Sequence, residues 1–218
     1  MDGASAAVVF DLDGTLLNTL DDLADSMNAV LAASGHPVHP VEAYRFFVGD
    51  GMASLVRRAL PKGRRDAAAV AAAGERMRSE YDRRWADKTR PYPGVPELLD
   101  GLAARGLRLA VLSNKPDDFT RATVARLLDR WRFDAVQGLR SDLPRKPDPT
   151  AARAMAAALG LPTGRCLYVG DSSTDMVTAR GAGMFAVGAA WGFRDREELV
   201  AAGAQAIAAS PAQVLELL

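Results

Sequence analysis

Apolar and polar residues follow two different periods along this chain. Short apolar runs typical of buried strands occur at 8–10, 107–112, 133–137, 166–169, 184–188 and 204–208. Helical patterns separate the later runs, at 97–105, 117–131, 150–159, 174–182, 197–202 and 211–218. This alternation predicts an α/β fold, with a Rossmann-like parallel sheet covered by helices on both faces.

A helical block interrupts the alternation directly after the first strand. Apolar residues at helical spacing predict helices over 20–34, 41–47, 52–60 and 65–85, and residues 15–89 show no convincing strand pattern. The Pro-rich segment Arg90–Pro96 marks the return to the strand–helix pattern. We therefore expect an α/β core formed by residues 1–15 and 90–218, with an all-helical insertion at 16–89.

Composition and charge narrow the function classes. The chain has 218 residues, and its 27 basic and 27 acidic residues balance, which gives no support for nucleic-acid binding. No stretch of about 18 consecutive apolar residues predicts a membrane span, and the N-terminus lacks the pattern of a secretory signal. The lone cysteine, Cys166, excludes an internal disulfide and fits a reducing compartment. We expect a cytoplasmic protein without a membrane partner, as a monomer or homodimer.

Two acids follow the first strand. Asp11 and Asp13 are two positions apart, so both side chains face the same way while the chain stays extended. They lie at the carboxyl edge of the predicted sheet, where open parallel sheets bind ligands. Asp and Gly14 are also common turn residues, so the pair alone leaves a simple turn open.

A second acidic edge follows the strand at 166–169. Asp171 comes after Gly170, and Asp175 lies four residues further. In a doubly wound sheet this strand neighbours the first, which brings these acids around one crevice with Asp11 and Asp13. Clustered carboxylates repel, and oxygen-only ligation suits Mg²⁺. Helix capping explains Asp175 equally well, so that alternative stays open for it.

Two further segments offer groups that could bind a phosphoryl group. Ser113 and Asn114 follow the strand at 107–112 and supply a hydroxyl and backbone donors at a helix entrance. Lys146 lies in a loop stiffened by prolines and supplies a cation. A helix cap and a solvated lysine are the simpler explanations of each segment alone. Together with the acids, the groups suit phosphoryl transfer through an aspartyl-phosphate, with a second acid serving the leaving alcohol and then water.

The sequence resembles the haloacid dehalogenase-like superfamily of hydrolases over essentially its whole length. Four regions carry the resemblance, in family order: Phe10–Thr15, Ser113–Asn114, Lys146–Pro147 and Gly170–Asp175. The resemblance implies that Asp11 is the nucleophile and Asp13 the general acid/base. It implies that Asp11, the Asp13 main-chain carbonyl and Asp171 bind Mg²⁺, with Asp175 helping directly or indirectly. It also implies that Ser113, Asn114 and Lys146 hold the phosphoryl group.

Within the superfamily, the sequence is most similar to the phosphoglycolate phosphatase group. The similar stretches are Phe47–Gly51, Arg57–Leu60, Pro91–Val95, Ser113–Pro116 and Trp191–Phe193. This similarity implies a Mg²⁺-dependent phosphatase acting on a small phosphorylated metabolite, with the helical insertion as a cap. Its expected substrate contacts are Asn114, Gly14, Thr15 and the cap loop Gly49, Asp50 and Gly51. Asp50 stands where an Asn is more usual in that loop.

Two other functions fit the same residues. A sugar phosphomutase of the phosphoglucomutase-like type shares the cap and the motifs, and it would isomerise a sugar phosphate without net phosphate release. A receiver-like phosphoacceptor module also combines an α/β fold with clustered acids, and it would form a stable phosphoprotein without turnover. The long helical insertion and Asp13 argue against the receiver-like module.

Overall fold

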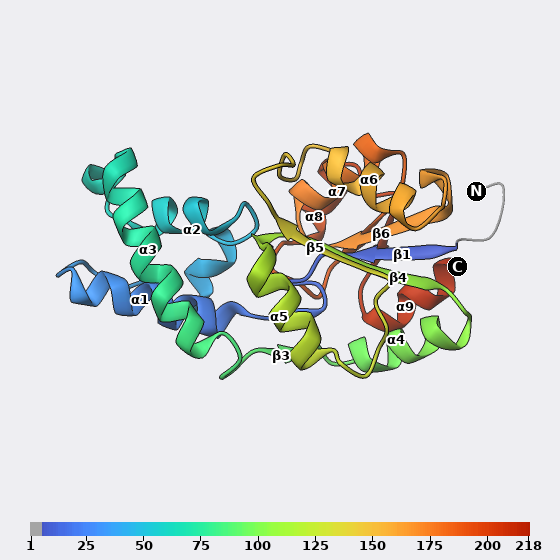
Figure 1. Cartoon of the computed structure of the whole chain (residues 1–218), viewed down its shortest axis with the longest axis horizontal. Helices are drawn as coiled ribbons and strands as arrows, with labels where there is room; N and C mark the ends of the chain where they lie inside the picture. The colour runs from blue at the N-terminus through green and yellow to red at the C-terminus, as the bar shows by residue number, and fades with distance from the viewer. Residues whose placement is uncertain (1–5) are drawn as a thin grey trace.

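The computed structural model describes residues 6–218, and its main body is a six-stranded sheet in which every pairing is parallel (Figure 1). In sheet order the strands are β5 (Ala135–Leu139), β4 (Arg108–Pro116), β1 (Ala7–Phe10), β6 (Cys166–Gly170), β7 (Phe185–Ala189) and β8 (Ala206–Ala208). The α/β prediction is confirmed, and β1 lies between β4 and β6 as expected. Residues 1–5, which belong to the expected core range and to the segment searched for a signal, lie outside the described residues.

Helices cover both faces of the sheet (Figure 1). One face packs against α4 (Val95–Ala104), α5 (Asp117–Leu127) and α9 (Pro211–Val214), and the other against α6 (Thr150–Ala158), α7 (Ser173–Ala182) and α8 (Arg196–Ala201). Along β1, Val8 and Phe10 join the first layer, whereas Ala7 and Val9 join the second. Burial on both sides explains why this strand is continuously apolar.

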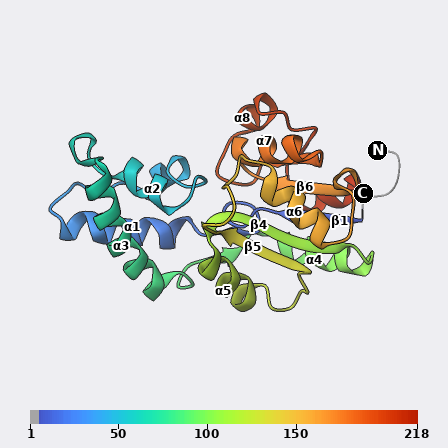
Figure 2. The same cartoon turned by 45° about the horizontal axis from the view of Figure 1, so that its top comes forward.

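The helical insertion forms a separate lobe beyond the carboxyl ends of the sheet strands (Figures 1 and 2). It contains α1 (Leu20–Ala33), α2 (Met52–Ala59), α3 (Ala67–Arg84) and two short 3₁₀ segments, Val41–Phe46 and Lys62–Arg64. Its apolar stripes meet in a second core around Met27, Tyr44 and Met77, which Phe119 and Phe193 of the α/β body also join. The lobe therefore caps the edge of the sheet at which the acids were predicted.

The prediction that residues 15–89 contain no strand is wrong. Leu17–Asn18 forms a short strand, β2, which pairs antiparallel with β3 (Arg90–Pro91). A strand of two residues is too short to show a periodicity in the sequence. The pairing forms because the two segments that connect the core to the helical insertion lie side by side. The buried Asp22 carboxylate braces them, because it accepts hydrogen bonds from the backbone N–H groups of Lys88 and Thr89.

Some predicted boundaries also differ from the structure. The strand predicted to end at Leu112 continues to Pro116, with a register shift relative to β5 after Leu112. Ser113 and Asn114 therefore lie within an irregular strand end rather than in a loop after it. The strand predicted at 133–137 runs from Ala135 to Leu139. Within it, Gly138 packs so closely on α5 that any side chain there would overlap Asp117.

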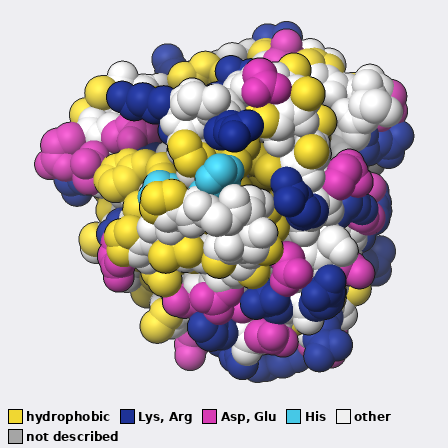
Figure 3. Space-filling model, turned by 90° about the vertical axis from the view of Figure 1, so that its left-hand side faces the viewer, with side chains coloured by type: hydrophobic (Ala, Val, Ile, Leu, Met, Phe, Trp, Pro, Cys, Tyr) yellow, Lys and Arg dark blue, Asp and Glu magenta, His cyan; other side chains and the backbone are white. Residues whose placement is uncertain are grey.

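The distribution of charged side chains on the surface is consistent with the equal numbers of acidic and basic residues. On the face seen from the cap end, acidic and basic side chains are interspersed without a large patch of one sign (Figure 3). Between residues 6 and 218, no helix has the length and apolar character needed to cross a membrane.

Candidate active site

Asp11 and Asp13 both line a cavity between the sheet edge and the cap. The Asp11 N–H donates to the Val169 carbonyl at 2.9 Å, which extends the pairing of β1 with β6 by one residue. The chain then turns, since the N–H groups of Leu16 and Leu17 return to the Leu12 carbonyl. The chain therefore turns directly after the strand, and both acids line the same cavity.

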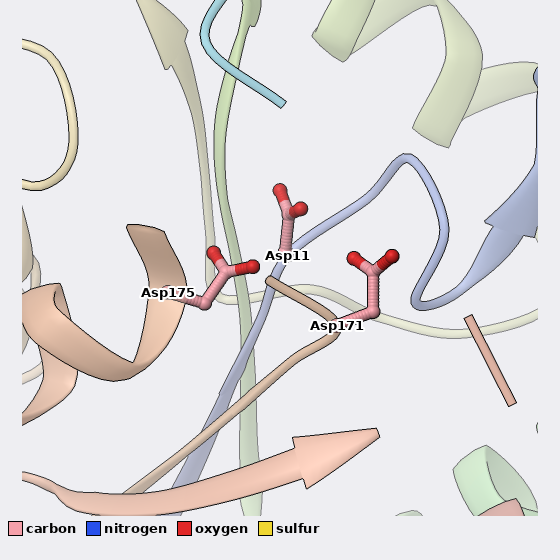
Figure 4. A group of neighbouring side chains, drawn as sticks. All are labelled: Asp11, Asp171 and Asp175. Atoms are coloured by element: carbon pink, nitrogen blue, oxygen red, sulfur yellow. The ribbon is translucent and has the colours of Figure 1, made fainter. Parts of the chain in front are cut away.

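Three buried carboxylates meet beside this cavity. Asp11, Asp171 and Asp175 each offer an oxygen within 4.8 Å of the others, from the residue after β1, the loop after β6 and the first turn of α7 (Figure 4). Asp171 is held by the Thr15 hydroxyl at 3.1 Å and the Phe193 N–H at 2.7 Å. Gly14 permits this approach, because a side chain there would overlap Asp171 and its φ is +90°.

The charge balance of this cluster calls for a cation. Burial and the neighbouring Asp175, opposed by Lys146, together raise the pKa of Asp11 to about 7. Burial and the neighbouring acids also raise the pKa of Asp171 well above its ordinary value. The three buried carboxylates form an oxygen-only donor set, which fits Mg²⁺.

Lys146 is almost fully buried, at 3% exposure, and is therefore not the solvated loop lysine of the simpler interpretation. Its Nζ lies 2.9 Å from Asp11 Oδ1 and 2.7 Å from Asp175 Oδ1. The other oxygen of Asp175 accepts from the Ser172 hydroxyl at 2.6 Å and the Ser172 N–H at 3.1 Å, as part of a capping box. Asp175 therefore holds Lys146 in place, and it also belongs to the group of three carboxylates that could hold a metal ion.

Ser113 and Asn114 have different surroundings. Both line the cavity, and the Ser113 hydroxyl accepts from the Lys115 N–H at 3.2 Å. The Asn114 amide exchanges two hydrogen bonds with the Lys146 backbone and donates a third to the Gly49 carbonyl at 3.1 Å. The Asn114 side chain therefore ties the Lys146 loop and the cap loop to β4.

The residues of the cap loop 49–51 lie in two different environments. Gly49 and Gly51 line the cavity, whereas Asp50 does not. The Asp50 carboxylate forms an ion pair with Arg58 and accepts from the Thr174 hydroxyl at 3.1 Å. Although burial opposes the change, these partners lower the pKa of Asp50. The acid at this unusual position is neutralised within the protein and links the cap to α7.

Two functional candidates escaped the sequence interpretation, Lys115 and Tyr81. Lys115 Nζ lies 2.8 Å from Asp13 Oδ1 and donates to the Tyr81 hydroxyl at 2.6 Å. Burial lowers the pKa of Lys115, but Asp13 and Tyr81 outweigh it and raise the pKa above its ordinary value. The sequence pattern could have indicated that Tyr81 is buried, because Ala73, Met77 and Tyr81 are spaced at four-residue intervals on one side of α3.

We expect Mg²⁺ to raise the Tm of the protein more at pH 8 than at pH 5.5. The folded-state pKa of Asp11 is about 7, against an ordinary value of 3.8, so the metal-free fold loses stability as pH rises between these values. Below pH 7 the proton on Asp11 competes with Mg²⁺. Above pH 7 the ion relieves the repulsion between the ionised carboxylates. At a hundredfold excess over Kd the gain is about 2.7 kcal/mol. Thermal melts with KCl of matched ionic strength as control check this; equal shifts at both pH values would contradict it.

Known proteins are similar to this chain in sequence and in fold. A family model described as haloacid dehalogenase-like hydrolase matches residues 8–189. A protein named phosphoglycolate phosphatase from Rhodospirillum rubrum is 38% identical over 207 residues, covering 92% of this chain and 86% of that protein. One of the same name from Pseudomonas syringae pv. tomato is 36% identical over 193 residues, covering 85% and 70%. A solved structure from Lactobacillus delbrueckii subsp. bulgaricus is similar with a TM-score of 0.92 and 30% identity, covering 99% and 98% of the two chains.

Proposed function

This chain belongs to the haloacid dehalogenase-like hydrolase family, and we propose that it is a Mg²⁺-dependent phosphatase of small phosphomonoesters such as phosphoglycolate. The observation that carries the proposal is the placement of Asp11 and Asp13 on one cavity, with Asp171 and Lys146 around Asp11. Names of relatives at 36% and 38% identity support phosphoglycolate as the first substrate to test.

The residues suit a reaction in two displacements. An Asp11 carboxylate oxygen attacks phosphorus, and the bond from phosphorus to the alcohol oxygen breaks as Asp13 gives that oxygen a proton. Asp13 then takes a proton from water, whose oxygen attacks the phosphorus of the acyl phosphate and restores the Asp11 carboxylate. Mg²⁺ held by Asp11 and Asp171 supplies charge neutralisation between the carboxylates and the phosphate.

The remaining groups bind the phosphoryl group and limit the size of the substrate. The Lys146 ammonium lies 2.9 Å from Asp11 and offers positive charge to phosphoryl oxygens beside the nucleophile. The Ser113 hydroxyl lines the same cavity. That cavity encloses about 40 Å³, which is room for a few water-sized atoms and therefore for a small leaving group.

A panel of phosphomonoesters, assayed for phosphate release with Mg²⁺ and with EDTA, tests the proposal. We expect release from phosphoglycolate, its loss in EDTA and its return with excess Mg²⁺. Undiminished release in EDTA would contradict the metal assignment. Isomerisation of a sugar phosphate without net phosphate release would instead indicate a phosphomutase, and a stable phosphoprotein would indicate a receiver-like module.

A further inference from the structure

The part of the cavity nearest Asp13 has an unusual charge pattern. Lys115 is the only cationic side chain among the described residues that line the cavity. The cap contributes an apolar wall there, formed by Leu23, Val48, Met52 and Leu55. In such surroundings a charged group on a ligand needs an opposite charge, and Lys115 on β4, opposite this wall, is the cation in the cavity lining.

Lys115 is held in place from both the core and the cap. Its side chain is buried on β4, and Tyr81, which is fully buried, reaches it from α3. The Tyr81 ring lies 4.8 Å from the ammonium, and Phe119 packs edge-on against the ring at 5.1 Å. An anion bound here meets a preformed pair, so little side-chain ordering opposes binding.

The pair retains unused hydrogen-bond donors. An ammonium has three N–H groups, of which Lys115 directs one to Asp13 and one to Tyr81. Tyr81 accepts from Lys115, so its own proton is free to be donated, and burial raises the pKa of Tyr81 to about 12, which keeps that proton in place. Among residues 6–218, the side chains of Lys115 and Tyr81 make no hydrogen bond besides these two.

The position of the pair relative to Asp13 limits the length of the ligand. In the proposed function Asp13 contacts the leaving oxygen, and Lys115 Nζ lies 2.8 Å from Asp13. A group that reaches Lys115 is therefore only a few bonds from the scissile oxygen.

We propose that Lys115 and Tyr81 form the subsite for a carboxylate on the leaving alcohol, so that the enzyme selects short phosphorylated hydroxy acids over neutral phosphoesters of the same size. The proposal rests on the proposed phosphatase function. It assigns substrate selection to the strand end of the core and to α3, rather than to a side chain of the cap loop 49–51.

A matched pair of substrates tests the subsite: phosphoglycolate and 2-hydroxyethyl phosphate, which replaces the carboxylate with a hydroxymethyl group. We expect the wild type to prefer phosphoglycolate in kcat/KM. Lys115→Met should lower kcat/KM for phosphoglycolate about 100-fold more than for 2-hydroxyethyl phosphate, mainly through KM. Tyr81→Phe, which removes no charge, should change the same ratio about tenfold. Lys62→Met, at an exposed cap lysine, is the control and should leave the ratio unchanged.

The ratio separates the subsite from a structural role. If Lys115 only orients Asp13, both substrates lose equally in Lys115→Met, and the proposal is wrong. A wild type that hydrolyses both substrates with equal kcat/KM would overturn it as well. If Lys115→Met fails to fold by circular dichroism, Lys115→Gln and Tyr81→Phe provide the same ratio. Absence of phosphate release from every monoester would instead overturn the proposed function itself.

Discussion

Replacing Asp11 with Asn will lower phosphate release by at least about 10⁴-fold, because an amide cannot serve as the attacking carboxylate. The change is nearly isosteric, so the cavity and the packing of β1 should persist. The measurement is kcat for phosphoglycolate with saturating Mg²⁺, on protein prepared free of the wild-type enzyme. Substantial residual turnover in that preparation would refute Asp11 as the nucleophile.

The same variant provides its own folding control. Burial and the charge of Asp175 raise the pKa of Asp11, so the ionised group opposes folding above pH 7 in the absence of metal. Asp11→Asn removes that charge, and we expect its metal-free Tm at pH 8 to equal or exceed the wild-type value. A much lower Tm would show that the loss of activity reflects damage to the fold.

Replacing Lys146 with Met will impair both stability and activity. Lys146 is the buried cation between Asp11 and Asp175, and its removal leaves two carboxylates without their counter-charge. Breaking a buried pair in this way costs about 3–5 kcal/mol of unfolding free energy. Loss of the positive charge beside the transferring phosphoryl group should lower kcat by roughly 10³-fold.

The stability cost of Lys146→Met should depend on pH. Below the pKa of Asp11, which is about 7, protonation neutralises that carboxylate, so the cost should shrink between pH 8 and pH 5. Urea unfolding at both pH values measures it, with Lys62→Met as the matched control at an exposed lysine. A cost that is small at pH 8, or unchanged at pH 5, would contradict the ion-pair role.

Much of this arrangement follows from local patterns in the sequence. Asp11 and Asp171 each follow a short apolar strand, and parallel strands bring their carboxyl ends to one edge of the sheet. The first strand precedes the helical block, so the block had to be an insertion. These inferences need only periodicity and the topology of parallel sheets, which is why the sheet and the meeting of the two acids could be predicted.

The features that escaped prediction depend on contacts between distant segments. Lys115 and Tyr81 are 34 positions apart, on the core and the cap, and no local pattern specifies their hydrogen bond. The sequence placed Asp50 near the substrate, whereas in the structure its carboxylate accepts a hydrogen bond from Thr174, which is 124 positions away in the chain. Both placements are set by how the cap packs on the sheet edge.

The central claim is that Asp11 becomes phosphorylated during turnover, and chemical trapping tests it most directly. Enzyme mixed with phosphoglycolate and Mg²⁺ is quenched in acid and treated with borohydride, which reduces an aspartyl-phosphate to homoserine. Peptide mass spectrometry should then find homoserine at position 11, only when substrate was present. Homoserine at Asp13, Asp171 or another acid, or at no position while turnover proceeds, would contradict the account.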